Sequence, residues 1–357
     1  MNSPLVSVLI STYNRLSLLK CCLSSVLNQS YKNLQIIIID DCSTDGTYEY
    51  LNNIKDLRLE YIKNEKNIVS KSGEESNYRL SHSKKRGKFF INLGDDDYWP
   101  NLLFIENCIN IFNQYPTLAK IIGTQVNYYY DKEYISYSYD QIKNFLKNKD
   151  NNFYHHNNIL PGGFLTGHEY LNLFSKNPLG INISTVGTMF SSDLFDKAKS
   201  LNLKTMSMVQ AGFELLIPCS LIGDVYYIND PCAVVGSKST SLSYNRTQIF
   251  HMKDQIKSVC NAFSNSRSIN HKINETILVK IKKEFINNIC AAYLFHSIEI
   301  MQKGKLSLCT QNNMKGYVRF IDVLKILLAN KIWFNYKLLI AIFLYLKTKL
   351  FFNNSKI

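Results

Sequence analysis

The sequence predicts an α/β fold in which a mixed, mostly parallel sheet is flanked by helices and followed by a C-terminal helical extension. Short apolar runs alternate with amphipathic stretches near the N-terminus, and helical periodicity dominates after about residue 246. The 357 residues are 46% apolar and 19% charged, which is enough apolar material for a large core. We therefore expect one domain over residues 1–245, with halves 1–115 and 116–245, and a helical extension over 246–357.

The first half alternates strands and helices. Residues 5–10 form a β-rich run, and residues 16–27 carry leucines at the spacing of one helix face. A second buried strand is expected over 35–39 and a second helix over 44–54, opened by Ser43 or Thr44 as the N-cap. Consecutive strand–helix units imply a parallel sheet with right-handed crossovers.

A polar cluster follows each of three predicted strands. The clusters are 12–15, 40–45 and 95–97, the last after a strand predicted over 89–93. In parallel α/β sheets, ligands bind beyond the carboxyl ends of the strands. We therefore expect all three clusters to converge at one edge of the sheet.

The triple aspartate at 95–97 carries the most chemical information. Three adjacent carboxylates repel one another, and a hard divalent cation such as Mg²⁺ or Mn²⁺ would neutralise them and bridge a diphosphate. The same residues also suit a solvated acidic turn before a helix that starts near Pro100. Asp40 and Asp41 leave a similar choice open, between ordinary turn chemistry and recognition of the imide N–H of a uracil ring.

Taken in order, the three segments resemble the pattern of glycosyltransferase family 2. They read Ser-Thr-Tyr-Asn-Arg at 11–15, Asp-Asp-Cys-Ser-Thr-Asp-Gly-Thr at 40–47 and Gly-Lys-Phe-Phe-Ile-Asn-Leu-Gly-Asp-Asp-Asp-Tyr-Trp at 87–99. The resemblance is strong over 4–115 and weaker over 180–245, where 183–190 is similar to an acceptor-side strand. It implies a Rossmann-like GT-A fold and inverting transfer of a sugar from a nucleotide diphosphate donor, with Mn²⁺ or Mg²⁺ held by an Asp-x-Asp motif.

The resemblance also implies roles for individual residues. Thr12, Tyr13 and Arg15 would line the nucleotide pocket, and Asp40 or Asp41 would read the base. Asp95, Asp96 and Asp97 would hold the ribose and the metal, with Asp96 as the first choice of metal ligand.

Two positions of this acidic and basic set depart from the family pattern. An additional Asp usually precedes the acidic cluster, and here that place is Gly94, which leaves open which two carboxylates form the working pair. Arg79 lies one residue from the usual place of an arginine that contacts the diphosphate. Arg79 also fits a solvated loop arginine.

Inversion needs a general base that deprotonates the acceptor hydroxyl. The family supplies it from an Asp-x-Glu-Leu segment, and here Gly212 stands at the place of that Asp. Glu214 is the nearby carboxylate and the predicted catalytic base, although it also suits a helix N-terminal charge. Asp193 and Asp224 are the alternatives.

Charge and cysteine usage restrict the partners. The net charge is +13, and beyond Met314 eight Lys and Arg residues face one Asp. The apolar run 338–346 is too short to cross a bilayer, and it suits either a helix lying on an anionic cytoplasmic membrane face or a helix docked on the protein. Nine cysteines without Cys-x-x-Cys spacing and no leader pattern indicate a cytoplasmic protein. The basic tail and its apolar run would make this protein peripheral on the cytoplasmic face of the inner membrane.

The leading hypothesis is an inverting, metal-dependent glycosyltransferase. It would take a donor such as a UDP-sugar and extend a surface glycan, or a lipid-linked glycan, of the capsule or lipopolysaccharide type. The alternative is a related protein that binds nucleotide sugars but is catalytically impaired, as Gly212 would permit. We expect no nucleic-acid partner, because the basic residues gather in a lipid-compatible tail, and a homo-oligomer is compatible with the sequence. Residues 140–163 are predicted to form a mobile insertion over the acceptor side.

Overall fold

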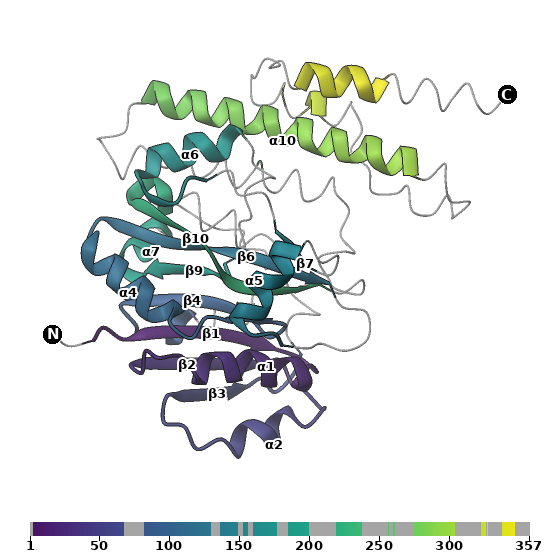
Figure 1. Cartoon of the computed structure of the whole chain (residues 1–357). Coiled ribbons are helices and arrows are strands. Elements are labelled where there is room, and N and C mark those ends of the chain that lie inside the picture. Colours follow the sequence, from purple (N-terminus) through teal and green to yellow (C-terminus); the bar gives the residue numbers. More distant parts are fainter. Residues whose placement is uncertain are drawn as a thin grey trace.

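The computed structural model shows a twisted sheet with helices on both faces (Figure 1). Within the described residues, ten strands form this one sheet. The structure describes residues 3–67, 82–129, 136–148, 153–155, 160–176, 185–199, 219–237, 256, 260, 275–303, 323–325, 327 and 338–346.

The N-terminal half has the predicted alternation of strands and helices. The helix predicted over 16–27 has those bounds. The second helix is shorter than the predicted 44–54, and its N-cap is Gly46 at φ +89°, so the expectation of Ser43 or Thr44 as the N-cap is wrong. β1, β2 and β4 are buried along nearly their whole length, as parallel strands covered on both faces should be, whereas the edge strand β3 is only partly buried. The elements are β1 (Val6–Thr12), α1 (Leu16–Leu27), β2 (Leu34–Asp40), α2 (Thr47–Asn52), β3 (Leu59–Lys63) and β4 (Phe89–Gly94).

The strand order reverses direction in the first half of the sheet. The sheet runs β3-β2-β1-β4-β9-β6-β10-β5, so the chain moves from β1 to one side through β2 and returns to the other side at β4. β1 pairs in parallel with both neighbours. The order therefore reverses at β1 and β4, and ligands of open α/β sheets bind at such a switch point, beyond the carboxyl ends.

The second half extends the sheet with strands of mixed direction. β9 pairs antiparallel with β4 and β6, and β10 pairs in parallel with β6. Consequently β4, β6 and β10 end at the same edge. The elements are β5 (Asp97–Tyr98), α4 (Phe104–Gln114), β6 (Leu118–Tyr129), α6 (Gly167–Lys176), β9 (Thr188–Ser191), α7 (Ser192–Lys199) and β10 (Asp224–Ser237).

The stretch predicted as a mobile insertion holds regular structure where it is described. It contains α5 (Tyr139–Asn148), β7 (Phe153–His155) and β8 (Gly163–Leu165). β7 pairs with β6 and β8 pairs with β10, so backbone hydrogen bonds join both short strands to the main sheet. The described parts of this stretch are therefore regular elements attached to the sheet.

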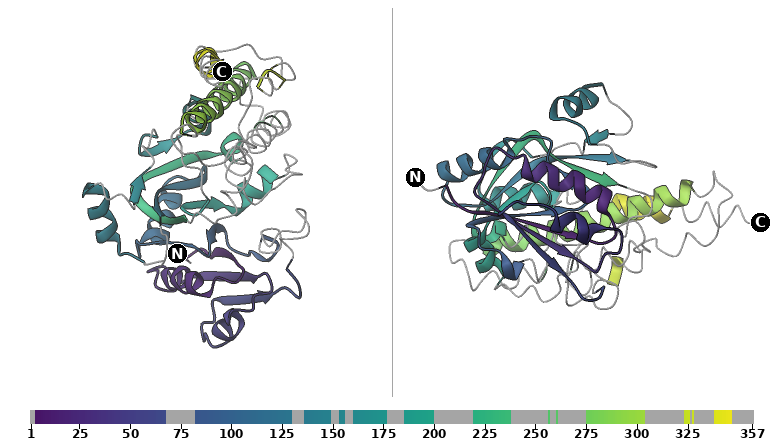
Figure 2. Two further views of the ribbon diagram at one scale, coloured as in Figure 1. Left: turned by 90° about the vertical axis from the view of Figure 1, so that its right-hand side faces the viewer. Right: turned by 90° about the horizontal axis from the view of Figure 1, so that it is seen from below.

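Each face of the sheet has its own core, because alternate strand residues point to opposite sides. Val8 and Ile10 pack with α1 and α4, whereas Leu9 belongs to the core beneath α6 and α7. The second core continues into the C-terminal helix α10 (Glu275–Lys303), where Phe285 lies against Phe174 of α6. Figure 2 shows α10 and the helix 338–346 on this side of the molecule. Among the described helices, none is long and apolar enough to span a membrane.

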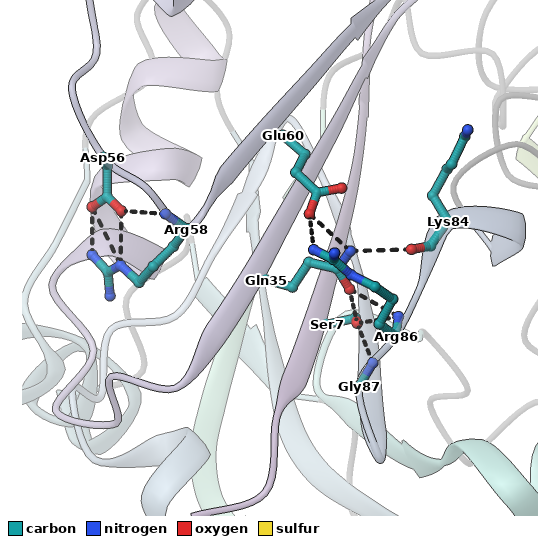
Figure 3. Close-up of polar contacts among 8 residues, drawn as sticks. All are labelled: Ser7, Gln35, Asp56, Arg58, Glu60, Lys84, Arg86 and Gly87. Atoms are coloured by element: carbon teal, nitrogen blue, oxygen red, sulfur yellow. Dashed lines mark hydrogen bonds and ion pairs between the residues drawn. The ribbon is translucent and has the colours of Figure 1, made fainter.

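A polar network aligns the first strands at the edge where they begin (Figure 3). The buried Ser7 hydroxyl donates to Oε1 of Gln35 at 2.6 Å and accepts from the Gly87 backbone N–H at 2.9 Å. Gln35 in turn donates to Glu60 at 3.1 Å, and Glu60 pairs with Arg86. The contacts join β1, β2, β3 and the start of β4, so they fix the register of the strands that carry the polar clusters.

Candidate functional site

The three predicted clusters meet at one edge of the sheet. Thr12 is the register partner of Asp40, and Ser11 is the register partner of Gly94, directly before the triple aspartate. This confirms the expected convergence. The ends of β1, β2 and β4 therefore build a single site.

Thr12 and Arg15 bind the acidic cluster directly. The Thr12 hydroxyl donates to Oδ2 of Asp95 at 2.8 Å. The Arg15 guanidinium donates from one nitrogen to Asp95 at 3.0 Å and to Asp96 at 3.2 Å. One cation thus faces two carboxylates, with the Arg15 side chain 38% exposed and that of Asp96 24% exposed.

The acidic cluster carries excess negative charge. Burial and the neighbouring Asp96 raise the pKa of Asp95 to about 6, although Arg15 and Thr12 act in the opposite direction. Burial likewise raises the pKa of Asp96, which Arg15 opposes, and that of Asp97, where Asp96 adds to the effect. Added positive charge at this position would therefore stabilise the ionised carboxylates.

The donor set suits a hard divalent cation that is shared with a ligand. In the described part of the chain, no three His, Cys, Asp or Glu side chains converge into a ready metal cage. Mg²⁺-type ions are ordinarily held by one or two protein carboxylates together with phosphate oxygens and water. Asp96 has a partly exposed carboxylate at the right place for this arrangement.

Asp97 faces different partners from the other two aspartates. Its Oδ1 accepts a hydrogen bond from the Gly236 backbone N–H at 3.1 Å, and its backbone pairs with Val235 of β10. Asp97 is 6% exposed. Its carboxylate therefore ties the acidic cluster to the end of β10, a positioning role that the sequence did not suggest.

The structure also explains Gly94, where the family pattern has a carboxylate. A Cβ atom at residue 94 would lie 2.4 Å from Oδ2 of Asp97 and 3.0 Å from Oδ1 of Asp96. The first distance is far shorter than a van der Waals contact and the second is tight, so the Asp97 carboxylate would have to move from its place. Glycine at this position allows the following aspartates to fold back over the strand end.

Asp40 and Asp41 are both buried, and they differ in their contacts. Asp40 accepts from the Ser43 backbone N–H at 2.9 Å and from the Tyr61 hydroxyl at 2.8 Å, so both of its oxygens hold the surrounding loop. Asp41 accepts from the Asn64 side chain at 2.9 Å. Both carboxylates therefore lie at the end of β2 beside the acidic cluster, held by residues of β3 and the segment that follows it.

The loop that follows β1 is braced by residues of the predicted polar clusters to which the sequence analysis gave no part in ligand binding. Asn14 has φ +51°, its backbone N–H donates to the Ser43 hydroxyl at 2.9 Å, and its side chain accepts from the Thr44 backbone N–H at 2.8 Å. The Asp45 carboxylate accepts from the first amide of α1 at 2.8 Å. Asn14 follows β1 and Ser43 follows the neighbouring strand β2, so their positions in the sequence could have indicated that these two residues meet.

Other predicted residues are only partly placed. Tyr13 directly follows Thr12, the last residue of β1, and its side chain is exposed to 45%. Arg79, Gly212 and Glu214 lie outside the described residues.

The two alternative bases lie at the opposite edge of the sheet from the acidic cluster. Asp224 begins β10, whereas Gly236, which contacts the cluster, is near its end. Asp193 follows β9, whose Ser191 pairs with Phe89 at the start of β4. These two carboxylates are therefore remote from the site.

A separate groove of about 460 Å³ lies between α4 and β10. Asn107 of α4 and Tyr226 of β10 are among its lining residues, and none of the described site residues lines it. The groove is therefore distinct from the acidic site.

Comparison with known proteins agrees with this arrangement. Residues 7–177 match the family model described as Glycosyl transferase family 2. The chain is 36% identical over 131 residues to the Escherichia coli protein named UDP-Glc:alpha-D-GlcNAc-diphosphoundecaprenol beta-1,3-glucosyltransferase WfaP, covering 37% of this chain and 49% of that one. It is 30% identical over 152 residues to the putative teichuronic acid biosynthesis glycosyltransferase TuaG of Bacillus subtilis, covering 40% and 58%.

The aligned part thus spans about half the length of these relatives. Among solved structures, the chain is similar to S. aureus TarS 1–349 in complex with UDP-GlcNAc, with a TM-score of 0.55 and 12% identity over 80% of this chain and 72% of that one. At this identity, the likeness concerns the fold.

Proposed function

Because residues 7–177 belong to glycosyl transferase family 2, within a GT-A fold, we propose that the protein transfers a sugar from a nucleotide diphosphate donor to a hydroxyl group of a growing glycan. One observation carries the proposal. Thr12, Arg15, Asp95 and Asp96 are brought into direct contact at the switch point of the sheet, although 80 or more residues separate the two pairs in the chain.

In this proposal the acidic cluster and Arg15 serve the diphosphate. Asp96, with Asp95 beside it, would hold Mn²⁺ or Mg²⁺, and Asp97 would position the cluster through Gly236. A bound divalent cation would stabilise the negative charge that develops on the leaving diphosphate. Arg15 already lies against the same carboxylates, so its guanidinium is within reach of an anionic group bound beside them.

We propose a UDP-sugar as the donor. Asp40 or Asp41 would accept a hydrogen bond from the base, and the exposed ring of Tyr13 would pack against the base. The support comes from relatives and neighbours, since WfaP is named for UDP-Glc and TarS was crystallised with UDP-GlcNAc.

We propose Glu214 as the general base of an inverting reaction. The other candidates, Asp193 and Asp224, lie at the wrong edge of the sheet. Exchange of Glu214 for Gln should abolish transfer while UDP binding persists. Unchanged turnover would assign the base elsewhere.

We propose a lipid-linked glycan as the acceptor. WfaP is named for a diphosphoundecaprenol-linked acceptor, and a second relative, from Campylobacter jejuni, is named for a PP-undecaprenol-linked one. Such an acceptor would place the reaction at the cytoplasmic face of the inner membrane. Residues 246–357 would then serve as a helical extension of the catalytic domain.

The decisive experiment combines binding and transfer. Thermal unfolding is measured with UDP, GDP and dTDP, each with Mn²⁺ or with EDTA, followed by transfer from labelled UDP-Glc and UDP-GlcNAc to synthetic GlcNAc-diphospho-lipid. We expect UDP with Mn²⁺ to raise the melting temperature by several degrees, and one donor to label the lipid. Absence of any nucleotide-dependent shift would overturn the proposal. Binding without hydrolysis or transfer from any donor would instead favour the impaired binding protein.

A further inference from the structure

The helix over residues 338–346 is apolar on every side. Its nine residues are Leu, Leu, Ile, Ala, Ile, Phe, Leu, Tyr and Leu, without a charged or amide side chain. A helix that only docks on a protein core needs one apolar face and keeps polar residues on the other. The opposite face therefore needs an explanation.

One face is buried in the protein. Leu338 and Ala341 are fully buried, and Tyr345 is 1% exposed. These residues belong to the same core as Phe285 and Ile289 of α10. The packing fixes the rotation of the helix about its axis, so the orientation of its outer face is also fixed.

The outer face presents large apolar side chains to solvent. Phe343 is 67% exposed, Leu339 is 49% exposed and Leu346 is 42% exposed. Their spacing of four and three residues places them in one row on the helix surface. Leu344, 37% exposed, widens the row on one side. We call these four residues the apolar row.

The surrounding sequence is strongly basic. From Lys315 to the C-terminus there are eight Lys and Arg residues and one Asp, and Lys337 and Lys347 directly flank the helix. Basic segments are attracted to anionic lipid surfaces, at about 1 kcal/mol per residue near the membrane. Trp333 and Tyr336 just before the helix are residue types that favour the membrane interface.

We propose that the apolar row is a docking surface for an anionic lipid bilayer. The helix lies in the plane of the membrane with Leu339, Phe343 and Leu346 inserted among the acyl chains near the headgroups, while its inner face keeps it attached to α10. This surface stands independently of the chemistry of the acidic site. Only the identity of the membrane, the cytoplasmic face of the inner membrane, rests on the proposed function.

A second copy of the chain fits the surface less well. Four partly exposed side chains present a few hundred Å², whereas a standard interface buries about 800 Å² on each partner. Two copies would also bring two basic tails together, and like charges repel. An anionic bilayer complements both the apolar row and the charge.

The test is flotation of the full-length chain with vesicles. Wild type is compared with the triple variant L339Q/F343Q/L346Q on vesicles of phosphatidylcholine alone and of phosphatidylcholine with phosphatidylglycerol. We expect wild type to float with the anionic vesicles, to bind at least tenfold less to the neutral ones, and to be partly released by high salt. The triple variant should lose at least tenfold in bound fraction.

A matched control exchanges three exposed apolar side chains elsewhere on the surface for glutamine. Leu57, Leu102 and Leu103 are at least 50% exposed, so L57Q/L102Q/L103Q should float as wild type does. If the first triple variant fails to fold, F343W serves instead, because it keeps the apolar character of the row. Its added tryptophan fluorescence should be quenched by brominated lipid, relative to wild type, only with anionic vesicles.

Three outcomes would overturn the proposal. Wild type does not bind anionic vesicles, or a folded triple variant floats as well as wild type does. The third is that light scattering shows wild type to be a dimer and the triple variant a monomer. The last would assign the surface to a second copy. UDP binding is measured in parallel. Flotation without UDP binding would refute the proposed function and leave the docking surface standing, and the converse result would do the opposite.

Discussion

The hydroxyl of Thr12, the last residue of β1, donates a hydrogen bond to the buried carboxylate of Asp95, 83 residues further along the chain. The contact bridges the point where the strand order reverses. Exchange of Thr12 for Val keeps the shape and leaves that carboxylate oxygen without its donor. We expect a loss of about 1–3 kcal/mol in the free energy of unfolding and weaker UDP binding.

Urea denaturation and UDP titration check this expectation. Thr44 offers a control, because it is an exposed threonine in the adjacent loop, and Thr44→Val should change stability by less than about 0.5 kcal/mol. Equal stability of the Thr12 and Thr44 variants would show that the Asp95 contact contributes little.

Asp96→Asn should abolish the effect of divalent cations. The substitution removes a charged oxygen ligand while preserving size, so we expect loss of the Mn²⁺-dependent part of UDP binding and a fall of at least about 100-fold in kcat/KM. Isothermal titration with and without EDTA gives the first readout, and sugar transfer gives the second.

Asp56 is a close structural match for an Asp96 control. Each side chain is 24% exposed and each pairs with an arginine, Asp56 with Arg58 at 2.7 Å and Asp96 with Arg15 at 3.2 Å (Figure 3 shows the first pair). Asp56→Asn should leave UDP and Mn²⁺ binding unchanged. If both variants lose Mn²⁺ dependence equally, Asp96 has no specific part in it.

Gly94→Asp should fail to improve the enzyme, although it restores the carboxylate of the family pattern. Its Cβ would collide with the Asp97 carboxylate, and overpacking of this kind costs about 1–3 kcal/mol. Denaturation should show reduced stability, with Gly94→Ala also destabilised because the same Cβ is added. A Gly94→Asp protein that is as stable as wild type and more active would contradict this account.

Stability should depend on pH through Lys120. Burial lowers the pKa of Lys120 to about 7, and its amine donates to the Ser220 hydroxyl at 2.7 Å and lies 4.3 Å from the centre of the Tyr170 ring. Below about pH 7 both the folded and the unfolded chain hold the proton, so the full cost of a buried charge is present. Between about pH 7 and 10.4 only the unfolded chain holds it, so stability rises with pH.

Exchange of Lys120 for Met removes this slope. The wild-type free energy of unfolding, minus that of K120M, should increase by an amount on the order of 4 kcal/mol between pH 7 and 10. K88M is the control, because Lys88 also lies over an aromatic ring, at 5.5 Å from the centre of Phe89, but is exposed. A difference that is flat with pH for K120M would refute the expected proton release.

Much of the site could be predicted from sequence because strand ends carry it. Apolar runs located β1, β2 and β4, and the parallel connection rule then brought Thr12, Asp40 and the acidic cluster to one edge. The spacing of Ile277, Ile281, Phe285 and Ile289 also predicts one helix face. In α10 the last three of these residues are buried, whereas Ile277 is 37% exposed.

The sequence did not predict which partner each carboxylate of the site contacts. Asp40 and Asp41 are adjacent and identical in type, and only their partners, Tyr61 and Asn64, distinguish them. The same holds for Asp97, whose contact with Gly236 comes from a strand 139 residues away. Side-chain direction at a strand end depends on such distant partners.

Substitutions at the two edges of the sheet should differ in their effect on strand alignment. Ser7, Gln35, Glu60 and Arg86 clamp the strands together where they start, far from the acidic residues. Because these contacts already align the strands, exchanges at the other end should cost stability locally without changing the register of the strands. The ligand-contacting residues at that edge could therefore vary, in evolution or in design, while the arrangement of the strands is kept.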